Sequence, residues 1–262
     1  MAGVSRLQYS PDIKIVRLMC TGRVDLTFIL RALMNGNDGV FIGGCWLGEC
    51  HYITEGNYDA MSMMHLGKKL IEHVGLNPDR FRMEQISASE GIRFSEVMND
   101  FAKTLKSLGP LGEAEGLDED ELRTRLEEVT RLVPYIKLAK SDKLVLRLEK
   151  AEDYDALFTR EEIDELLGDV PAYYIDPEKC RACMMCRNRC PVKAIDGDRS
   201  RIHIIDQEAC IKCGMCLEVC PPRFGAVTKL HGVPVPPPIS EEERTITRKG
   251  KTEVGEIPVA VD

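Results

Sequence analysis

Two runs of four cysteines limit what this chain can fold into more than any other feature of its sequence. The first run is Cys180, Cys183, Cys186 and Cys190, followed by Pro191, and the second is Cys210, Cys213, Cys216 and Cys220, followed by Pro221. Each run has the spacing Cys-x2-Cys-x2-Cys-x3-Cys-Pro. The residues ahead of the runs match too, since Ile175-Asp176 recurs as Ile205-Asp206. The cysteine-dense segment is therefore an internal duplication.

This spacing resembles that of a bacterial-type two-cluster ferredoxin domain, an α+β fold that binds two 4Fe–4S clusters. Three thiolates spaced three residues apart can wrap around one cubane cluster, and the fourth ligand then comes from the other half of the repeat. The resulting crossed assignment gives the first cluster Cys180, Cys183, Cys186 and Cys220. It gives the second cluster Cys210, Cys213, Cys216 and Cys190.

Zinc and disulfide bonds are the alternatives to iron–sulfur clusters. Structural zinc usually takes paired Cys-x2–4-Cys motifs with a longer gap between them, which fits this duplicated run poorly. Disulfides belong to oxidising compartments, and Met1–Tyr9 lacks the basic-then-apolar layout of a secretory signal. Of the 11 cysteines, eight lie between Cys180 and Cys220. The sequence therefore favours a cytoplasmic iron–sulfur protein.

Charge divides the chain into four parts. Net charge is 0 over residues 1–110, −9 over 111–170, +3 over 171–232 and −2 over 233–262. We interpret these parts as an α/β domain, an acidic helical linker, the ferredoxin domain and a Pro-rich charged tail. The total of −8 argues against a nucleic-acid partner. Because no run of about 18 apolar residues is present, no membrane span is expected.

A basic patch surrounds the first cysteine run: Lys179, Arg181, Arg187, Arg189 and Lys193. Positive charge stabilises the reduced, more negative form of a cluster, so the patch should raise the potential of the first cluster. The same charges would steer an acidic partner towards this surface. The alternative, which explains these side chains equally well, is that they are ordinary solvated surface residues.

Residues 1–110 alternate between strand and helix patterns. Apolar or alternating runs predict strands at 13–19, 40–42 and 80–86, and helical periodicity predicts helices at 25–34, 58–74 and 87–108. This alternation indicates a parallel sheet with helices on its faces. Cys20, Cys45 and Cys50 follow strand ends, at the sheet edge where ligands collect. On spacing alone, ordinary buried thiols explain them equally well.

Several stretches of this part resemble the delta subunit of the methyl-viologen-reducing hydrogenase, over about residues 2–109. The stretches are Ala2–Tyr9, Val16–Asp25, Asp38–Cys45, Gly48–Tyr52 and Gly56–Tyr58. The resemblance implies an electron-transfer subunit with a flavodoxin-like sheet and a 2Fe–2S cluster bound by Cys20, Cys45 and Cys50. It also implies partners: a hydrogenase or formate dehydrogenase, and a flavin-bearing heterodisulfide reductase subunit.

One departure from that family concerns the start of the chain. Family members carry a first strand and a Cys-x-x-Cys pair ahead of the stretch Ala2–Tyr9, where this chain has only Met1. The flavodoxin-like sheet would then lack its first strand, and three thiolates would remain where a 2Fe–2S cluster takes four ligands. A truncated gene product would explain the difference. His51 as a fourth ligand is the alternative, although histidine more often bonds a local partner, here beside Tyr52.

The remaining segments carry structural signals. Asp118-x-x-Glu121 and Thr159-x-x-Glu162 predict helix starts, and Pro134 is expected to kink or end the helix between them. The acidic segment serves either as a connector or as a docking surface. The Pro-rich stretch after Val233 predicts an extended arm that is mobile or bound to a partner.

Taken together, the motifs predict an electron-transfer subunit of a multisubunit oxidoreductase. No catalytic nucleophile, general base or substrate pocket is apparent in the sequence. The alternatives are a flavin-dependent oxidoreductase with a ferredoxin module and a redox-sensing or assembly scaffold. Metal content separates them, since about 8 irons per chain means that the ferredoxin clusters alone are filled and about 10 means that a 2Fe–2S cluster is present as well.

Overall fold

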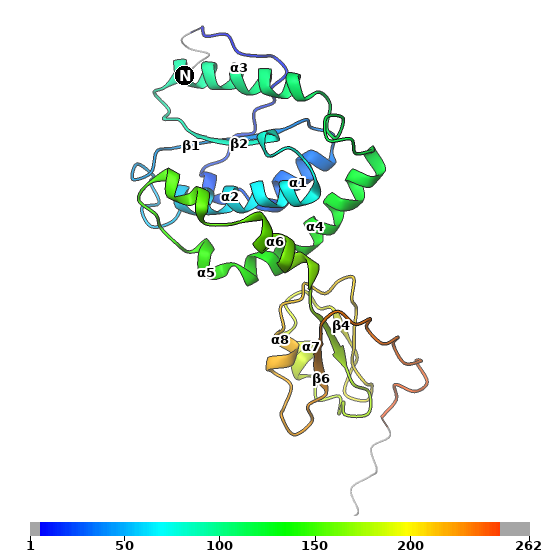
Figure 1. The fold of residues 1–262 in the computed structure, drawn as a ribbon. Helices are drawn as coiled ribbons and strands as arrows, with labels where there is room; N and C mark the ends of the chain where they lie inside the picture. Colours follow the sequence, from blue (N-terminus) through cyan, green and yellow to red (C-terminus); the bar gives the residue numbers. More distant parts are fainter. Residues whose placement is uncertain (1–5, 247–262) are drawn as a thin grey trace, which may run out of the picture. The chain divides into compact units, whose positions relative to one another are not determined.

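The computed structural model describes residues 6–246, and the chain divides into two compact units, residues 1–169 and 170–262 (Figure 1). Each unit is considered by itself below. Within the described residues, no helix combines the length and apolarity that crossing a membrane requires.

A two-stranded parallel sheet lies at the centre of the first unit. Strand β1 (Val40–Gly44) pairs with β2 (Phe81–Gln85) in a register that sets the two strands fully alongside each other. Figure 1 shows α3 (Gly91–Leu108) on one face of this sheet and α1 (Leu26–Met34) and α2 (Asn57–Val74) on the other. The prediction of an α/β domain with a parallel sheet is thereby confirmed.

Local signals set the ends of these helices. The carboxylate of Asp25 accepts a 2.9 Å hydrogen bond from the Thr27 N–H and caps α1. Gly75 ends α2 with φ of 101°, a left-handed conformation that glycine adopts without steric cost. At α3 the carboxylate of Glu90 accepts from the Ser87 N–H at 2.6 Å, and the helix begins at Gly91. The helix prediction for this domain is confirmed to within a few residues.

The strand predicted at residues 13–19 is wrong. This segment has no strand assignment, and Val16 and Met19 are 81% and 88% exposed. Its first residues instead line a cavity of about 760 Å³ between β1 and α3. A β-forming pattern becomes a strand only where a neighbouring strand offers its backbone groups. Within the described residues β1 pairs with β2 alone.

The acidic helices belong to the first unit. They are α4 (Glu119–Ala139), α5 (Ser141–Leu144) and α6 (Arg160–Gly168), with the 3₁₀ helix η3 (Ala151–Ala156) between the last two. Helix α4 packs on α1 and α6 packs on α2, and both contribute to one apolar core. Asp118 and Thr159 cap α4 and α6 as predicted. Helix α4 continues through Pro134 rather than ending there.

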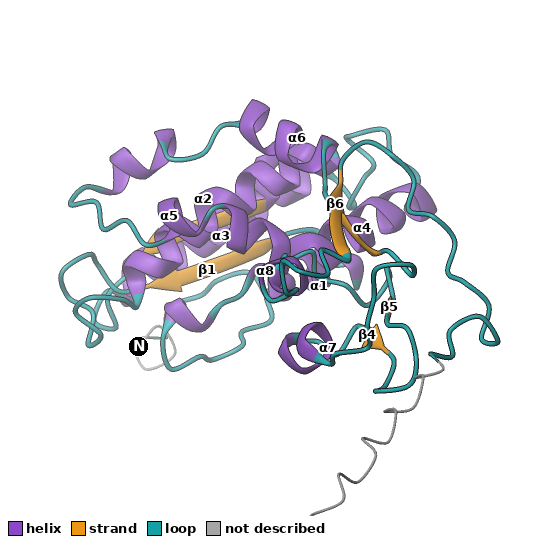
Figure 2. Cartoon of the chain, turned by 90° about the horizontal axis from the view of Figure 1, so that it is seen from below, coloured by secondary structure: helices purple, strands orange, loops and turns teal. Residues whose placement is uncertain are grey.

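In its described part, up to residue 246, the second unit contains two antiparallel strand pairs. Strand β3 (Ala172–Ile175) pairs with β6 (Val227–Leu230), and β4 (Ile195–Asp196) pairs with β5 (Ile204–Ile205) (Figure 2). Two short helices, α7 (Met185–Arg189) and α8 (Met215–Glu218), follow the two cysteine loops. Each half of the duplication thus supplies strands and one cysteine loop, in a ferredoxin-like arrangement.

The described part of the Pro-rich tail is attached to this second unit. The Arg244 guanidinium, 2% exposed, donates to the Ile202 carbonyl at 3.1 Å and to the Asp196 carboxylate at 2.8 Å. In return the Ile202 N–H donates to the Arg244 carbonyl at 2.8 Å. The arm expected from the sequence is therefore bound to its own chain up to residue 246. Residues 247–262 lie outside the described part.

Candidate functional site

The eight cysteines of the duplication gather around two cavities in the second unit. Cys180, Cys183, Cys186 and Cys220 line the first cavity. Cys190, Cys210, Cys213 and Cys216 line the second. In each cavity, three cysteines come from one run and the fourth comes from the other run. The structure therefore brings together the two groups of the crossed assignment.

The backbone adopts the same unusual conformation in both cysteine loops. Ala182 and Met184 have φ of 48° and 68°, and Lys212 and Gly214, thirty positions later, have 59° and 78°. A side-chain-bearing residue in this left-handed region costs about 1–3 kcal/mol, and such residues cluster at functional sites. The repeated strain turns each loop around its cavity.

Burial makes ionisation of the Cys186 and Cys216 thiols unfavourable in the absence of a cation. Burial, followed by the charges of Cys180 and its neighbours, raises the pKa of Cys186 to about 12. Burial and then Cys210 raise the pKa of Cys216 to about 12 in the second cavity. Metal binding reverses such shifts because it requires thiolates and compensates their charge. Four cysteine sulfurs around one cavity, with Cys186 buried in the first and Cys216 in the second, thus fit an iron–sulfur cluster.

Within the described residues, no three His, Cys, Asp or Glu side chains converge closely enough to hold a single metal ion. The fit of these sites to iron therefore rests on the cysteine spacing and on the two cavities.

Three further thiols lie near one another in the first unit, with Cys50 between the other two. Cys45 follows β1 directly, Cys20 precedes the 3₁₀ helix η1 (Thr21–Arg23), and Cys50 lies in the loop before α2. Burial and then the Cys50 thiol raise the pKa of Cys45 to about 11, and burial raises that of Cys20, with Cys50 contributing as well. Cys50 therefore lies next to both of the other thiols.

The N-terminus of α2 favours the thiolate of Cys50. Burial raises the pKa of Cys50, but hydrogen bonds from the N–H groups of Asn57 and Tyr52 and from the thiols of Cys45 and Cys20 together outweigh burial, so the net shift is downward. Asn57 is the first residue of α2, where the helix dipole favours negative charge. A Cβ atom at Gly56 would collide with the Cys50 sulfur, so only glycine fits there. This geometry suits a thiolate ligand.

His51, the alternative fourth ligand, is exposed and packs edge-on against Tyr52, with ring centroids 5.3 Å apart. The groups that perturb the three thiols do not include His51. Its observed partner is thus the neighbouring aromatic ring.

Sequence reasoning missed two buried polar residues at these sites. The Asn57 side-chain amide donates to the carbonyls of Cys45 and Trp46 at 3.2 and 2.6 Å and ties the cysteine loop to α2. His203 lies with Nδ1 3.3 Å from the sulfur of Cys186. Asn57 lies in the stretch Gly56–Tyr58 that carries the family resemblance, but nothing in the sequence assigned it a role, and His203 belongs to no motif. Only their contacts in the fold identify what they do.

The second unit is ferredoxin-like and has two cysteine-lined cavities, and the α/β domain carries three neighbouring thiols. Together they define an iron–sulfur electron-transfer subunit. Residues 1–109 match the model of the family "Methyl-viologen-reducing hydrogenase, delta subunit", and residues 172–221 match the 4Fe–4S dicluster domain. The chain belongs to the family of methyl-viologen-reducing hydrogenase delta subunits, as its sequence motifs indicated.

Curated relatives of two kinds support this membership. The iron–sulfur subunit of the F420-non-reducing hydrogenase of Archaeoglobus profundus is 52% identical over 110 residues, which are 42% of this chain and 80% of that protein. The iron–sulfur subunit of the vhc F420-non-reducing hydrogenase of Methanococcus voltae is 46% identical over 42% of this chain and 75% of its own length.

The second kind of relative is a much longer protein. It is a subunit of the Ferredoxin:CoB-CoM heterodisulfide reductase of Methanosarcina mazei, which is 43% identical over 131 residues, or 50% of this chain. The match covers only 16% of that longer protein.

Proposed function

We propose that this chain relays single electrons from a hydrogenase or formate dehydrogenase to a heterodisulfide-reductase-type flavoprotein subunit. Support comes from the relatives, whose names place them in F420-non-reducing hydrogenase and in heterodisulfide reductase. The observation that carries the proposal is the pair of cavities, each with three cysteines from one run and one from the other.

The proposed ligands follow the cavities. Cys180, Cys183, Cys186 and Cys220 would hold one 4Fe–4S cluster, and Cys190, Cys210, Cys213 and Cys216 the other. Cys20, Cys45 and Cys50 would supply three ligands of a 2Fe–2S cluster in the first unit. Bound iron–sulfur clusters supply the one-electron chemistry.

The protein's own residues hold the ligands, limit the access of water and keep the two sites close. Cys186 and Cys216 are buried, at 6% and 8% exposed, which limits the access of water. The Ala194 N–H donates to the Cys190 sulfur at 3.3 Å and fixes the crossing ligand of the second cavity. Cys186 is among the groups whose charge perturbs Cys216, so the two cavities are neighbours. Proximity of this kind favours electron exchange between them.

The matched variants Cys190→Ser and Cys220→Ser test the ligand assignment. In the anaerobically purified full chain, we expect Cys190→Ser to damage the cluster of the second cavity and to leave that of the first intact. Cys220→Ser should do the reverse, because each variant removes one crossing ligand. Iron and sulfide analysis with electron paramagnetic resonance of the reduced protein reads out both clusters. Loss of the first-cavity cluster alone in Cys190→Ser would contradict the crossed assignment.

The composition of the same wild-type sample tests the wider function. We expect about 8 or about 10 irons per chain, with an equal amount of sulfide. When the reduced protein is mixed with an oxidised heterodisulfide reductase flavoprotein, we expect the flavin of that flavoprotein to be reduced and to lose its absorbance. Zinc without sulfide would overturn the proposal. A stoichiometric flavin bound to this chain itself would favour a flavin enzyme over an electron relay.

A further inference from the structure

The duplication places a ring at a corresponding position in each of its halves, and the two rings differ in chemistry. Tyr173 and His203 stand thirty residues apart, at corresponding positions ahead of Ile175-Asp176 and Ile205-Asp206. Tyr173 lines the second cavity, whereas His203 lines the first. The two halves therefore differ in the side chain that faces the cysteines.

His203 contacts a proposed ligand sulfur directly. The side chain is 1% exposed, and its Nδ1 lies 3.3 Å from Sγ of Cys186. An iron-bound thiolate sulfur carries no proton and can only accept a hydrogen bond. Nδ1 must then be the donor in this contact, whatever the state of the other ring nitrogen.

The second ring nitrogen of His203 is buried too. Within the described residues, Nε2 makes no hydrogen bond of ordinary geometry, although the backbone carbonyl of Asp198 acts on the ring as an acceptor. Buried polar groups normally have hydrogen-bond partners, so a buried histidine calls for an explanation through the contacts of its ring nitrogens. The contact of Nδ1 with the Cys186 sulfur supplies one.

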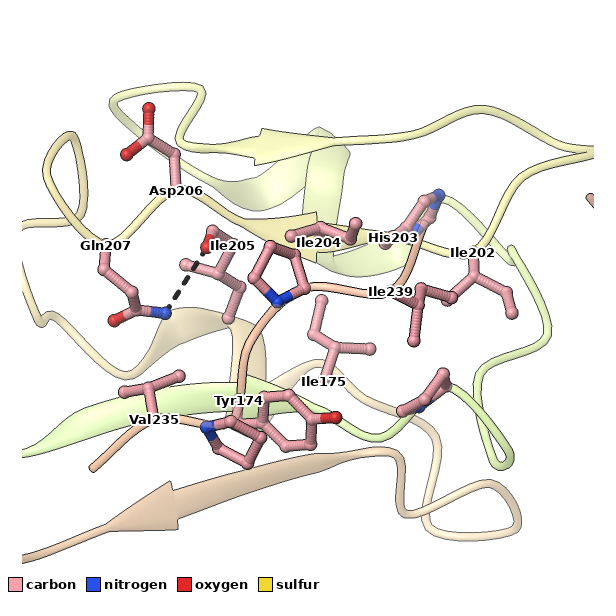
Figure 3. A pocket seen from close by; sticks show the side chains of 13 residues that line it. Tyr174, Ile175, Ile202, His203, Ile204, Ile205, Asp206, Gln207, Val235 and Ile239 are labelled. Atoms are coloured by element: carbon pink, nitrogen blue, oxygen red, sulfur yellow. Dashed lines mark hydrogen bonds between the residues drawn. The ribbon is translucent and has the colours of Figure 1, made fainter. Parts of the chain in front are cut away.

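The fold holds the ring in place and keeps water away from it. Gly197, with φ of 143°, lies so close that a Cβ atom there would collide with the His203 ring. His203 and Ile175 also line a third cavity of about 270 Å³, which is apolar and contains no cysteine (Figure 3). Pro236 and Pro238 help to enclose it. Apolar surroundings lower the local dielectric and strengthen the hydrogen bond to sulfur.

We propose that His203 is a tuning residue, whose Nδ1–H···Sγ hydrogen bond to Cys186 raises the reduction potential of the first cluster above that of the second. Reduction adds negative charge to a cluster and its sulfurs, and a donated N–H stabilises the more negative state. Electrons that enter the second unit then settle preferentially on the first cluster. The inference rests on the proposed function, which makes Cys186 a ligand.

Two substitutions separate the hydrogen bond from ring packing. His203→Phe keeps the ring and removes the donor, whereas His203→Asn shrinks the side chain and keeps an amide N–H near the position of Nδ1. We expect His203→Phe to lower the equilibrium constant for one-electron reduction of the first cluster about tenfold, which corresponds to about 59 mV. His203→Asn should stay close to wild type. The potential is measured by redox titration of the full chain, followed by electron paramagnetic resonance.

Tyr173→Phe is the matched control, since it alters the corresponding ring of the second cavity and should leave the first potential unchanged. An unchanged potential in His203→Phe overturns the proposal. A shift in His203→Asn equal to or larger than that in His203→Phe overturns it as well, because ring packing would then be responsible.

A measurement on the wild-type chain does not depend on variant stability. With nitrogen-15-labelled histidine, pulsed electron paramagnetic resonance should detect a nitrogen coupled to the reduced first cluster through the hydrogen bond. If that coupling is absent from a chain with full iron and sulfide, this inference fails while the proposed function stands. If iron and sulfide themselves are absent, the proposed function fails.

Discussion

Arg80 shows how one residue can organise a region of the first unit. Its guanidinium is fully buried, and its Nε donates to the carboxylate of Glu115 at 2.7 Å. It also donates to the backbone carbonyls of four residues: Asp38, Leu108, Gly109 and Pro110. These carbonyls lie in the loop before β1 and at the end of α3. One side chain thus satisfies acceptors that the fold would otherwise bury without partners.

Replacing this arginine should be severely destabilising. Arg80→Met leaves Glu115, whose side chain is 7% exposed, without its counter-charge, and we expect unfolding to become easier by about 3–5 kcal/mol. The control is Arg82→Met, which removes a side chain that is 30% exposed and pairs with Glu84 and with the exposed Asp100, and should cost at most about 1 kcal/mol. Urea unfolding of the full chain measures both. Similar losses for the two variants would count against this role of Arg80.

At the scale of elements, an aromatic contact attaches the acidic segment to α2. The ring of His65, on α2, stacks on that of Tyr154, in η3, with centroids 6.0 Å apart. Tyr154 is fully buried, and its hydroxyl accepts a 3.0 Å hydrogen bond from the Leu148 N–H. Burial lowers the pKa of His65 to about 4, because the charged imidazolium would lose its hydration there.

This docking should weaken in acid. The unfolded chain protonates His65 near its ordinary pKa of 6.5, whereas the folded chain does so only near 4. Between these values the unfolded state binds more protons, so stability is full above about pH 6.5 and falls as the pH approaches 4. The loss reaches at most about 3 kcal/mol. Urea unfolding at several pH values should show a shallower pH dependence for His65→Gln than for wild type.

Tyr154→Phe is the control for that experiment, since it keeps the ring over His65 and should keep the wild-type slope. An identical slope for His65→Gln and wild type would rule out His65 as the source of this acid sensitivity.

Helix ends could be predicted from the sequence more reliably than strands. The caps at Asp118 and Thr159 act within a few residues, and the sequence indicated both. The helical periodicity of 25–34 and 58–74 also placed the helix ends near Asp25 and Gly75. The strand predicted at 13–19 failed because its pairing depends on a distant strand edge. Segments with local partners can be predicted from one sequence, whereas segments with remote partners often cannot.

At the scale of the whole molecule, the two units differ in the size and composition of their cores. The first has a large apolar core built from α1, α2, α4 and β2. The core of the second is small and includes the proposed ligands Cys180, Cys186 and Cys216 among its buried members. A domain of that size gains little from apolar burial, and metal binding then contributes directly to folding.

Removal of iron should therefore affect the two units unequally. After treatment with a chelator and an oxidant, we expect the second unit to unfold and residues 1–169 to keep their fold, because the apolar core of the first unit needs no metal. Limited proteolysis with mass spectrometry should find new cleavages within 170–246, and the untreated iron-loaded chain serves as the control. Simultaneous digestion of both units would show that their stabilities are coupled.

The sequence by itself determined the cysteine loops, the duplication, most helix ends and the family. The loops and helix ends are short-range patterns, in which neighbouring residues share one turn or one loop. The duplication and the family are recognised from the order of residues alone. Only the tertiary structure decided that His203 meets Cys186, that Arg80 pairs with Glu115, and that the acidic helices join the first core. Such contacts depend on which distant surfaces face each other after folding. Burial and hydrogen bonding depend on distance in space and not on separation along the chain.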